Sequence, residues 1–396
     1  MDKQIRDSQE QVNSKSPTEI TNEQAEDDQN VNTGGQPENQ TETSGRKRKW
    51  IRNIPLLIAE VCILVVAIGI MYVVVTATDE VERKNIDEEK IVINEEVKET
   101  QTVEEQQVSR GYRNIALFGV DARDGELGRG NRGDSIIIAS INQDTQEIKL
   151  VSVFRDTYLN LSNDSYNKCN AAYAQGGPEQ AINMLNTNLD LDITDYVTVG
   201  FSGLIDSVDA LGGIEIEVTD AEISHLNNYQ LTMSEELGVD YIPVEHSGKQ
   251  LLNGMQATAY CRIRYTKGDD FRRAERQRDV LTAMMEKAKQ ASASSLREMV
   301  TAILPEVETS LGVNEIVSVL GSVAGYNVIA SDGFPFEDSR TGATVGSKGS
   351  CVIPDDLEEN VIELHELLYP ETAYKPSRQV SRISMEIDEL TAEYRQ

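Results

Sequence analysis

Apolar residues in the second quarter of the chain fall into short runs separated by Gly, Asp and Asn. Residues 114–120 (NIALFGV), 135–141 (SIIIASI) and 148–154 (IKLVSVF) are rich in β-branched and aromatic residues, which predicts three β-strands. Apolar positions at helical spacing follow at 177–189 and 201–211, ahead of a strand-like run at 214–218. Strands that alternate with helices predict an α/β layered domain.

The second half of the chain carries more helical patterns and fewer strands. We expect helices at 252–260, 271–291, 295–303, 313–321 and 355–368, and short strands at 327–330 and 351–353. Residues 219–250 are polar with little periodicity, which is typical of a functional or mobile loop. The polar residues after about 372 are expected to be loosely attached.

The region before the first strand has three segments of different composition. Residues 1–45 are polar and almost without apolar residues, so we expect a disordered cytoplasmic tail. Residues 46–78 begin with RKRKWIR and continue as an apolar run long enough for one transmembrane helix. Residues 79–110 carry eleven acids against five bases and are expected to form an acidic extracytoplasmic stalk. A folded domain is then expected to cover 111–371, and 372–396 form a polar C-terminal tail.

The basic residues before the apolar run indicate which side of the cell membrane each part occupies. Such residues stay in the cytoplasm, so a single-pass anchor would place everything after residue 78 outside. A cleaved signal peptide is the alternative, because Val75-Thr76-Ala77 resembles a cleavage site. The 45-residue polar extension and the long apolar run favour an uncleaved signal anchor.

Composition narrows the classes of function. A formal net charge of -30 argues against a nucleic-acid binder, because phosphate backbones are held by an excess of Lys and Arg. Any anion must therefore be recognised locally. The cysteines outside the predicted span are Cys169, Cys261 and Cys351, with no CxxC motif. Free buried thiols are expected, and a Cys169–Cys261 disulfide stays open as an alternative.

The motif GRGNRG at 128–133 matches the dinucleotide pattern G-x-G-x-x-G. A dinucleotide site needs this motif directly after a strand and at the start of a helix. Here the motif leads into a predicted strand, so we exclude that reading.

Two carboxylates flank this loop. Asp121 follows the first predicted strand and Asp134 opens the second, so both could hold one hard cation through oxygen ligands. Aspartates at strand ends are often turn formers, which is the alternative. Arg123 and Arg132 lie between them in sequence, and cations beside paired carboxylates suit a site where a metal and arginines bind one polyanion.

Further cations occur at two places. Arg155 follows the third predicted strand, and ligands in open α/β sheets gather beyond the carboxyl ends of strands; an Arg-Asp turn with Asp156 is an equal alternative. Residues 260–280 (YCRIRYTKGDDFRRAERQRDV) contain six arginines and one lysine. Arginine forks grip phosphate oxygens bidentately, so this composition favours a di- or polyphosphate ligand.

Within 260–280 the spacing divides the cations. Arg262 and Arg264 are two apart and share a face if extended. Asp269 or Asp270 is placed to cap the next helix, and Arg273 and Gln277 share one face of that helix. We interpret these as two walls of one pocket for a di- or polyphosphate. Arg276, Arg278 and Lys267 are interpreted as solvated charges.

Taken together, these motifs resemble the LytR-CpsA-Psr family of cell-wall glycopolymer ligases. The resemblance runs from about residue 113 to 370 through NIALFGVDARDG, NRGDSIIIASIN, LVSVFRDTYLNL, NKCNAAYAQGG, VDALGGIEIEV, LLNGMQATAYCRIRY and DDFRRAERQ, in family order. It implies a three-layer α/β/α sandwich around a mixed sheet. It also implies transfer of a glycan phosphate from a polyprenyl pyrophosphate carrier to peptidoglycan, as in teichoic acid or capsule attachment, usually with Mg²⁺.

The resemblance also implies roles for single residues. Asp121 and Asp134 correspond to the metal carboxylates, and Asp270 to the acid that helps to deprotonate the acceptor hydroxyl. The implied pyrophosphate cage consists of Arg155, Arg262, Arg264, Arg273 and Gln277, with Arg132 and Lys168 as additional members. Gly133 stands where the family usually has serine and Arg272 where it usually has glycine, so the loop near the metal and the entry to the helix differ. A lipid pyrophosphate hydrolase and a non-enzymatic envelope sensor or attenuator are the alternatives.

Overall fold

A computed structural model describes most of the chain after residue 87. The described residues are 88–99, 111–122, 127–264, 269–292, 294–296, 300, 303–312, 316 and 322–395. All of them belong to one compact unit, 71–396. The predicted cytoplasmic tail and transmembrane segment lie outside the described residues. None of the helices formed by the described residues combines the length and the hydrophobicity that a membrane span requires.

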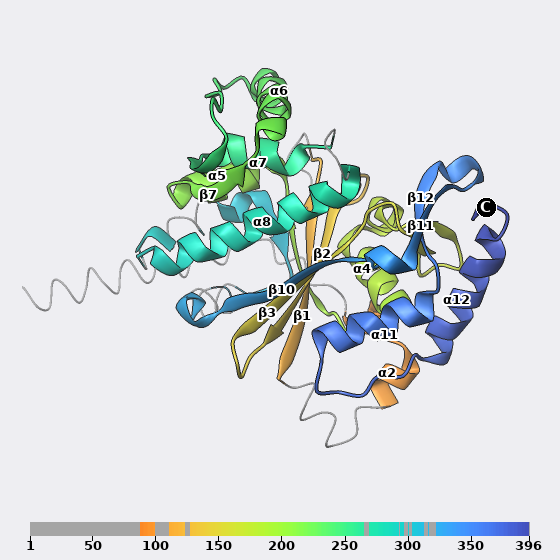
Figure 1. Ribbon diagram of the computed structural model, residues 1–396. Helices are drawn as coiled ribbons and strands as arrows, with labels where there is room; N and C mark the ends of the chain where they lie inside the picture. Colours follow the sequence, from red (N-terminus) through yellow and green to blue (C-terminus); the bar gives the residue numbers. More distant parts are fainter. Residues whose placement is uncertain are drawn as a thin grey trace, which may run out of the picture. The chain divides into compact units, whose positions relative to one another are not determined.

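A six-stranded mixed sheet forms the centre of the domain (Figure 1). Its order is β10 (Asn327–Phe334), β3 (Glu147–Val153), β2 (Gly133–Asn142), β1 (Tyr112–Val120), β6 (Asp195–Val199) and β9 (Val307–Thr309). The pairs β1–β2, β2–β3 and β6–β9 are antiparallel, whereas β1–β6 and β3–β10 are parallel. The three strands predicted between residues 114 and 154 are confirmed, and each pairs with its neighbour in sequence.

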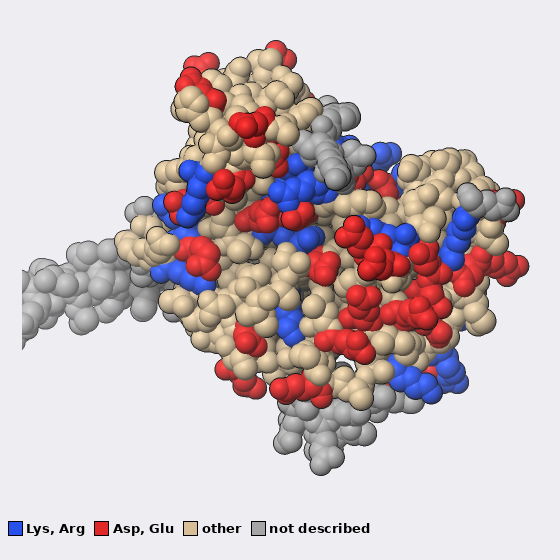
Figure 2. Space-filling model, in the orientation of Figure 1, with Lys and Arg blue, Asp and Glu red and all other residues tan. Residues whose placement is uncertain are grey.

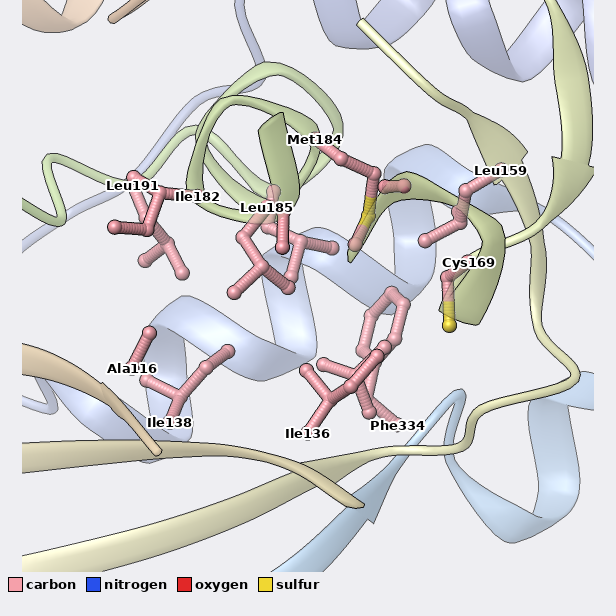
Figure 3. Packing of buried hydrophobic residues seen from close by; sticks show 14 of the residues in the cluster. Ala116, Ile136, Ile138, Leu159, Cys169, Ile182, Met184, Leu185, Leu191 and Phe334 are labelled. Atoms are coloured by element: carbon pink, nitrogen blue, oxygen red, sulfur yellow. The ribbon is translucent and has the colours of Figure 1, made fainter. Parts of the chain in front are cut away.

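One face of the sheet packs on three helices, α4 (Asn170–Leu189), α11 (Leu357–Leu368) and α12 (Arg378–Thr391). Alternate residues of β2 such as Ile136 and Ile138 point into this core, where they meet Ile182 and Leu185 of α4 (Figure 3). This alternation follows from the period of two in a strand. The side chains of this core are buried almost completely.

The other face is covered by α8 (Asp269–Gln290). Ile137 and Leu150 point to this side and pack with Leu281 and Met285 of α8. Helices therefore cover both faces of the sheet, as the α/β/α expectation states. The first residues of α8 lie near the end of the sheet where β1 finishes and β2 begins.

A smaller group of elements packs beside α8 around a core of its own. It consists of α5 (Phe201–Ala210), β7 (Ile214–Val218), α6 (Asp220–Leu237), β8 (Gly248–Leu252) and α7 (Gly254–Arg262). The expected polar loop at 219–250 is wrong in its first part, because α6 occupies it. Thr219 and Glu222 form a capping box at the start of α6, which is a sequence signal for a helix.

Two expectations about the ends of the domain are corrected. The C-terminal tail is not loosely attached, because α12 buries Val380, Ile383 and Ile387. The predicted stalk is not solvated throughout, because Asn94 is buried and donates to Asp190 Oδ1 at 2.5 Å. The short elements η1 (Glu88–Lys90) and α2 (Glu95–Glu99) flank this contact. The first described segment is thus docked on the domain.

The remaining elements are short. They are β4 (Tyr158–Asn160), β5 (Tyr166–Lys168), η2 (Leu304–Glu306), η3 (Val323–Gly325), η4 (Glu337–Ser339), β11 (Arg340–Thr344), η5 (Gly346–Lys348) and β12 (Ser350–Pro354). The predicted helices at 295–303 and 313–321 fall largely outside the described residues. In the part of the chain that is described, Cys169, Cys261 and Cys351 are buried free thiols, so the disulfide alternative is wrong.

The negative charge is unevenly spread. In the orientation of Figure 2, acidic side chains gather over α11 and α12, whereas lysine and arginine side chains gather along α8. A protein of net charge -30 can therefore still present a locally positive region.

Candidate active site

An apolar cavity of 330 Å³ lies between the sheet, α8 and the smaller group of elements. Its walls are mostly apolar and aromatic, and include Leu117, Ile137, Val197, Val199, Phe201, Leu204, Tyr229, Val280 and Leu281. Charged residues line the same cavity: Asp121, Asp134, Arg262, Arg264 and Arg273, with the amide of Gln277. We call this space the apolar cavity. Its composition suits a ligand with a long apolar part and an anionic head.

A second cavity of 240 Å³ lies beside it, and we call it the polar cavity. The two cavities share Asp134, Ser135, Arg273 and Gln277. Arg155 and Asp270 line only the polar cavity, together with residues of the β11–β12 hairpin. The shared residues therefore form the boundary between the two cavities, where the anionic head of such a ligand would contact both.

Arg155 lies at the centre of a network of charges. Its Nη1 donates to Asp134 Oδ1 at 2.8 Å, and its Nη2 is 3.7 Å from Asp270 Oδ2. Burial disfavours the charged guanidinium, but the carboxylates of Asp134 and Asp270 outweigh burial and raise the pKa of Arg155. The alternative prediction, an ion pair between Arg155 and Asp156 in a turn, is also found. Arg155 Nε lies 3.6 Å from Asp156 Oδ2. Arg155 is thus a fixed cation at the carboxyl end of β3.

Arg264 and Arg273 complete the network from the side of α8. Arg273 Nη1 lies 2.9 Å from Asp270 Oδ1, and Arg264 lies 3.8 Å from the same oxygen. Burial, followed by repulsion from Arg155, lowers the pKa of Arg273 to about 10, so this side chain is still a cation at neutral pH. Arg155 and Arg264 both repel the Arg273 cation, and this clustering of arginines favours an anionic ligand.

Arg262 occupies a different position from the one expected. It is the last residue of α7 and not part of an extended segment with Arg264. Its guanidinium lies over the rings of Phe201 at 4.5 Å and Tyr229 at 5.5 Å. The aromatic rings hold this cation beside the apolar cavity.

Several arginine nitrogens in this region have no hydrogen-bond partner among the described residues. They are Arg155 Nε, Arg262 Nη1 and Arg273 Nε, and all three are buried. Leaving a charged donor buried and unpaired costs free energy. Phosphate oxygens would satisfy these donors, so the orphaned nitrogens point to a phosphorylated ligand.

Asp121 and Asp134, the predicted metal carboxylates, can be compared with the coordination that Mg²⁺ prefers. Asp121 and Asp134 line the same cavity, as expected from neighbouring strand ends. Across the described residues, no three His, Cys, Asp or Glu side chains gather in a way that could hold a metal ion. Mg²⁺ is commonly held by one or two carboxylates plus substrate phosphates and water. The two aspartates therefore fit a magnesium ion that binds together with a phosphorylated substrate.

The remaining predicted residues lie farther from the network. Lys168 lines neither cavity and pairs with Asp156 at 2.9 Å, so it contacts Arg155 only through that aspartate. Arg132 is exposed and also lines neither cavity. Arg123 lies outside the described residues. Of the substrate-binding set, the structure brings together Arg155, Arg262, Arg264, Arg273 and Gln277.

The expectation that Arg276 and Arg278 are solvated is wrong. Arg276 is 1% exposed and Arg278 is 6% exposed. Arg276 pairs with the buried Glu222 at 2.8 Å, and Arg278 Nε donates to Ser331 Oγ at 2.7 Å. Arg276 therefore links α8 to α6, and Arg278 links α8 to β10. Lys267 lies outside the described residues.

Sequence reasoning missed other residues of the site. Phe201 and Tyr229 come from segments that carry no charge pattern, and Ser152 is one small residue within a β-strand. The β11–β12 hairpin was missed because only its second strand has an apolar run. Asp156, which the sequence indicates only as a turn partner of Arg155, also lines the polar cavity.

The amino-acid sequence is similar to those of several known proteins. A sequence model of the LytR_cpsA_psr family matches residues 71–348. A polyisoprenyl-teichoic acid–peptidoglycan teichoic acid transferase, TagU of Enterococcus faecalis, is 32% identical over 208 residues, which is 52% of this chain and 63% of that protein. TagV of Bacillus subtilis, named as the same kind of transferase, is 28% identical over 290 residues, 70% of this chain and 68% of that protein. Biofilm regulatory protein A of Streptococcus mutans is 31% identical over 225 residues, 54% of this chain and 53% of that protein.

Solved structures show the same fold. The crystal structure of B. subtilis TagV has a TM-score of 0.52 and 26% identity, covering 67% of this chain and 98% of that chain. The crystal structure of B. subtilis TagT has a TM-score of 0.50 and 21% identity, covering 66% of this chain and 92% of that chain. The chain spans 63% of the length of its E. faecalis relative. The family match over 71–348, on a fold shared with these structures, shows that this chain belongs to the LytR_cpsA_psr family.

Proposed function

We propose that this chain is a membrane-anchored phosphotransferase that moves a glycan phosphate from a polyprenyl pyrophosphate carrier to peptidoglycan. The observation that carries the proposal is the apolar cavity of 330 Å³ that opens onto the arginine network. A polyprenyl pyrophosphate has the matching form, with an apolar chain joined to a polyanionic head. The names of the E. faecalis and B. subtilis relatives support this substrate class.

The donor would bind with its two parts in different surroundings. Apolar walls such as Val199, Leu204 and Leu281 take the prenyl chain, which leaves water at a gain of roughly 25 cal/mol for each Å² buried. The pyrophosphate meets Arg264 and Arg273 at the shared boundary of the cavities. Guanidinium groups suit this role because they bind phosphate oxygens bidentately.

The transfer itself needs charge neutralisation and alignment more than covalent help. A hydroxyl oxygen of peptidoglycan forms a bond to the phosphorus that carries the glycan. The bond from this phosphorus to the bridging oxygen breaks, and polyprenyl phosphate leaves. Arg155, Arg264 and Arg273 neutralise the charge on the phosphate oxygens during this exchange. Asp270, which lines the polar cavity within 4 Å of all three arginines, takes the proton of the hydroxyl.

Magnesium is part of the proposal. Asp121 and Asp134 would hold it, and when bound it supplies further positive charge at the phosphate oxygens. Asp134 also accepts from Arg155 Nη1 at 2.8 Å, so one carboxylate would both orient an arginine and help to hold the cation. The two roles are compatible because a carboxylate has several lone pairs.

We also propose the location that the sequence predicts. One helix within residues 46–78 would anchor the chain in the cell membrane, with the N-terminus in the cytoplasm. The domain would then stand outside, where lipid-linked donor and peptidoglycan acceptor are both within reach. The glycopolymer would be a teichoic acid or a capsule-type polymer.

The proposal is tested with the full-length protein, a synthetic lipid-pyrophosphoryl sugar, Mg²⁺ and peptidoglycan oligomers. Glycan-linked peptidoglycan is the expected product. Release of free sugar phosphate without acceptor would instead indicate a lipid pyrophosphate hydrolase. Bound but unchanged lipid would indicate a sensor or attenuator, and either result would overturn the transferase.

A further inference from the structure

The first described segment, residues 88–99, is held along α4, and we call this segment the strap. Val92 N donates to Asn183 Oδ1 at 2.7 Å, and Asn183 Nδ2 donates to Lys90 O at 3.0 Å. A single amide side chain of α4 therefore bonds the backbone of the strap twice. Ile91, which is 9% exposed, belongs to the main hydrophobic core. The strap is thus held by both polar and apolar contacts.

Asn94 fixes the strap at the end of α4. It is 6% exposed, and its Nδ2 donates to Asp190 Oδ1 at 2.5 Å and to Thr187 O at 3.1 Å. The same Nδ2 lies 3.5 Å from Ser377 Oγ, and Ser377 N donates to Asp190 Oδ2 at 2.8 Å. Asp190 is the C-cap of α4 and Ser377 is the N-cap of α12. One buried network therefore joins the strap to both helices.

The helix that helps to hold the strap lies outside the family match. The match ends at residue 348, and α12 begins at Arg378. Arg378 Nε donates to Glu96 Oε1 at 2.6 Å, and Figure 1 shows α2, which carries Glu96, close to α12. The docking surface of the strap is thus built partly by residues that the family model does not cover.

The direction of the strap relates it to the arginine network. Between Lys90 and Asn94 the contacts of the strap move from Asn183 to Asp190, so the strap runs in the same direction as α4. The first turn of α4 lies at the network, because its backbone bonds that of Arg155. The beginning of the strap is therefore the part of it that lies nearest to the network.

Docking of the strap changes where the preceding chain is attached to the domain. Without the strap, the attachment point is Tyr112 at the start of β1, and β1 runs from there to Asp121 at the apolar cavity. With the strap docked, the attachment point lies beside Asn183. Residues 79–87 can span at most about 30 Å, whereas residues 79–110 can span at most about 110 Å. Docking therefore shortens the tether and moves it toward the arginine network.

We infer that the strap is a positioning device, which holds the domain close to the membrane with the arginine network toward it. Its release lets the domain turn and move away from the lipid-linked donor. This inference rests on the proposed function, because it needs the membrane anchor within residues 46–78. A short tether raises the effective concentration of the domain at the membrane surface, and a longer one lowers it.

The first test measures which end of the sheet faces the membrane. Arg129, in the loop between β1 and β2, and Asp144, in the turn between β2 and β3, are exposed at opposite ends of the sheet. Arg129→Cys and Asp144→Cys are made in the full-length protein, reconstituted in phosphatidylcholine vesicles and labelled with a maleimide dye. The cysteines of the described domain are buried, and the labelled parent protein gives the background.

A lipid-bound acceptor dye in the vesicles should quench the label at 129 more strongly than the label at 144. Equal quenching, or stronger quenching at 144, would overturn the inference. Absence of quenching at both positions would overturn it together with the anchor. This readout needs no turnover, so it does not depend on the transfer assay.

The second test releases the strap by a change within it. Ile91→Ser combined with Asn94→Ala removes its core contact and its amide bonds. The domain should stay folded, because Asp190 keeps Tyr374 Oη and Ser377 N as donors, and circular dichroism checks this. We expect the difference in quenching between positions 129 and 144 to disappear. An unchanged difference would contradict the role of the strap.

A second variant releases the strap from the side of the domain. Asn183→Ala leaves the strap intact and removes its partner on α4, so it should also reduce the difference in quenching. Gln175→Ala is the matched control on the same helix, because the exposed Gln175 bonds Asn163 and not the strap. Equal effects of Asn183→Ala and Gln175→Ala would refute the inference.

Release should also slow transfer from a donor embedded in the vesicles. The longer tether lowers the rate roughly sevenfold, since effective concentration falls with about the −3/2 power of tether length. The rate with donor dissolved in detergent should not change. An equal loss with both donors would mean that the substitutions damage the site, and would overturn the strap. If the wild type transfers nothing even in detergent, the proposed function fails, and the quenching measurements still decide on the strap.

Discussion

Arg276 Nε lies 2.8 Å from Glu222 Oε1, and the two side chains are 1% and 3% exposed. The pair joins α8 to the first turn of α6. Arg276 Nη1 also donates to Ile263 O at 3.0 Å. Ile263 stands between Arg262 and Arg264, so the buried pair holds the backbone from which both of these cations extend into the site.

Glu222→Gln should destabilise the protein and also reduce transfer. The substitution leaves the Arg276 cation buried without its charged partner, which typically costs about 3–5 kcal/mol. The measurement is urea unfolding at pH 7. Glu275→Gln is the control, because Glu275 pairs with Arg272 on the same helix but is 48% exposed, and exposed pairs contribute roughly 0–1 kcal/mol. Equal losses in both variants would contradict the role of the buried pair.

The same pair predicts a pH dependence. Burial disfavours the carboxylate, but hydrogen bonds from Thr219 and Arg276 outweigh it and lower the pKa of Glu222 below its ordinary 4.5. A carboxyl with a lowered folded-state pKa contributes stability above its unfolded value and loses it as pH falls through the folded value. The difference between wild type and Glu222→Gln should therefore shrink below pH 4.5. Unfolding curves across this range would show whether it does.

Arg155→Ala and Arg264→Ala should each abolish transfer and leave the domain folded. Removing one group that stabilises a developing charge costs about 10²–10³-fold in rate, and each arginine also binds the substrate. Circular dichroism checks the fold, and the product assay checks transfer. Arg382→Ala on α12, whose side chain is 48% exposed, serves as the control. Full activity in both site variants would refute the site assignment.

Inorganic pyrophosphate should raise the unfolding temperature of the wild type. An anion offsets the repulsion among Arg155, Arg264 and Arg273 that helps to lower the pKa of Arg273. The shift should decrease as salt is added, because ions screen these interactions. Arg273→Gln should lose most of it. A shift of the same size in wild type and variant would show that pyrophosphate binds elsewhere.

Val199→Trp should block the apolar cavity without blocking the arginine network. The larger ring occupies the space that a prenyl chain would take, at a cost in stability of about 1–3 kcal/mol. We expect KM for a long-chain lipid donor to rise, while binding of inorganic pyrophosphate is retained. Loss of both would mean that the substitution disturbs the whole site.

Asp121→Asn should reduce the effect of magnesium on pyrophosphate binding. If Asp121 and Asp134 hold the ion, Mg²⁺ tightens pyrophosphate binding to the wild type, and chelation with EDTA reverses this. Calorimetry with and without Mg²⁺ measures the difference. Asp192→Asn, which lies on the far side of the domain against Asn114, is a control. An unchanged magnesium effect in Asp121→Asn would exclude it as a ligand.

Helices α6 and α12 were not predicted from the sequence, for two different reasons. In α12, Val380, Ile383 and Ile387 have the spacing of a helix face and Ser377 caps the first turn, so a signal was present in the polar segment. In α6 the buried positions include Glu222 and Gln230, and polar residues at buried positions hide the apolar face. Hydrophobic periodicity detects a face only when the residues on it are apolar.

The sequence by itself determined the central strands and the family, and it indicated an arginine-rich anion site, because β-rich runs, ordered motifs and arginine-rich spacing are local properties. Only the tertiary structure decided which cations face the cavities. Arg273 lies in the network, whereas Arg276, three residues on, is buried against Glu222, 54 positions away in the chain. The surroundings of a side chain are set by segments that folding brings together, and no local pattern contains that information. The same reason explains why the hairpin at 340–354 and Ser152 meet in one cavity only in the folded protein.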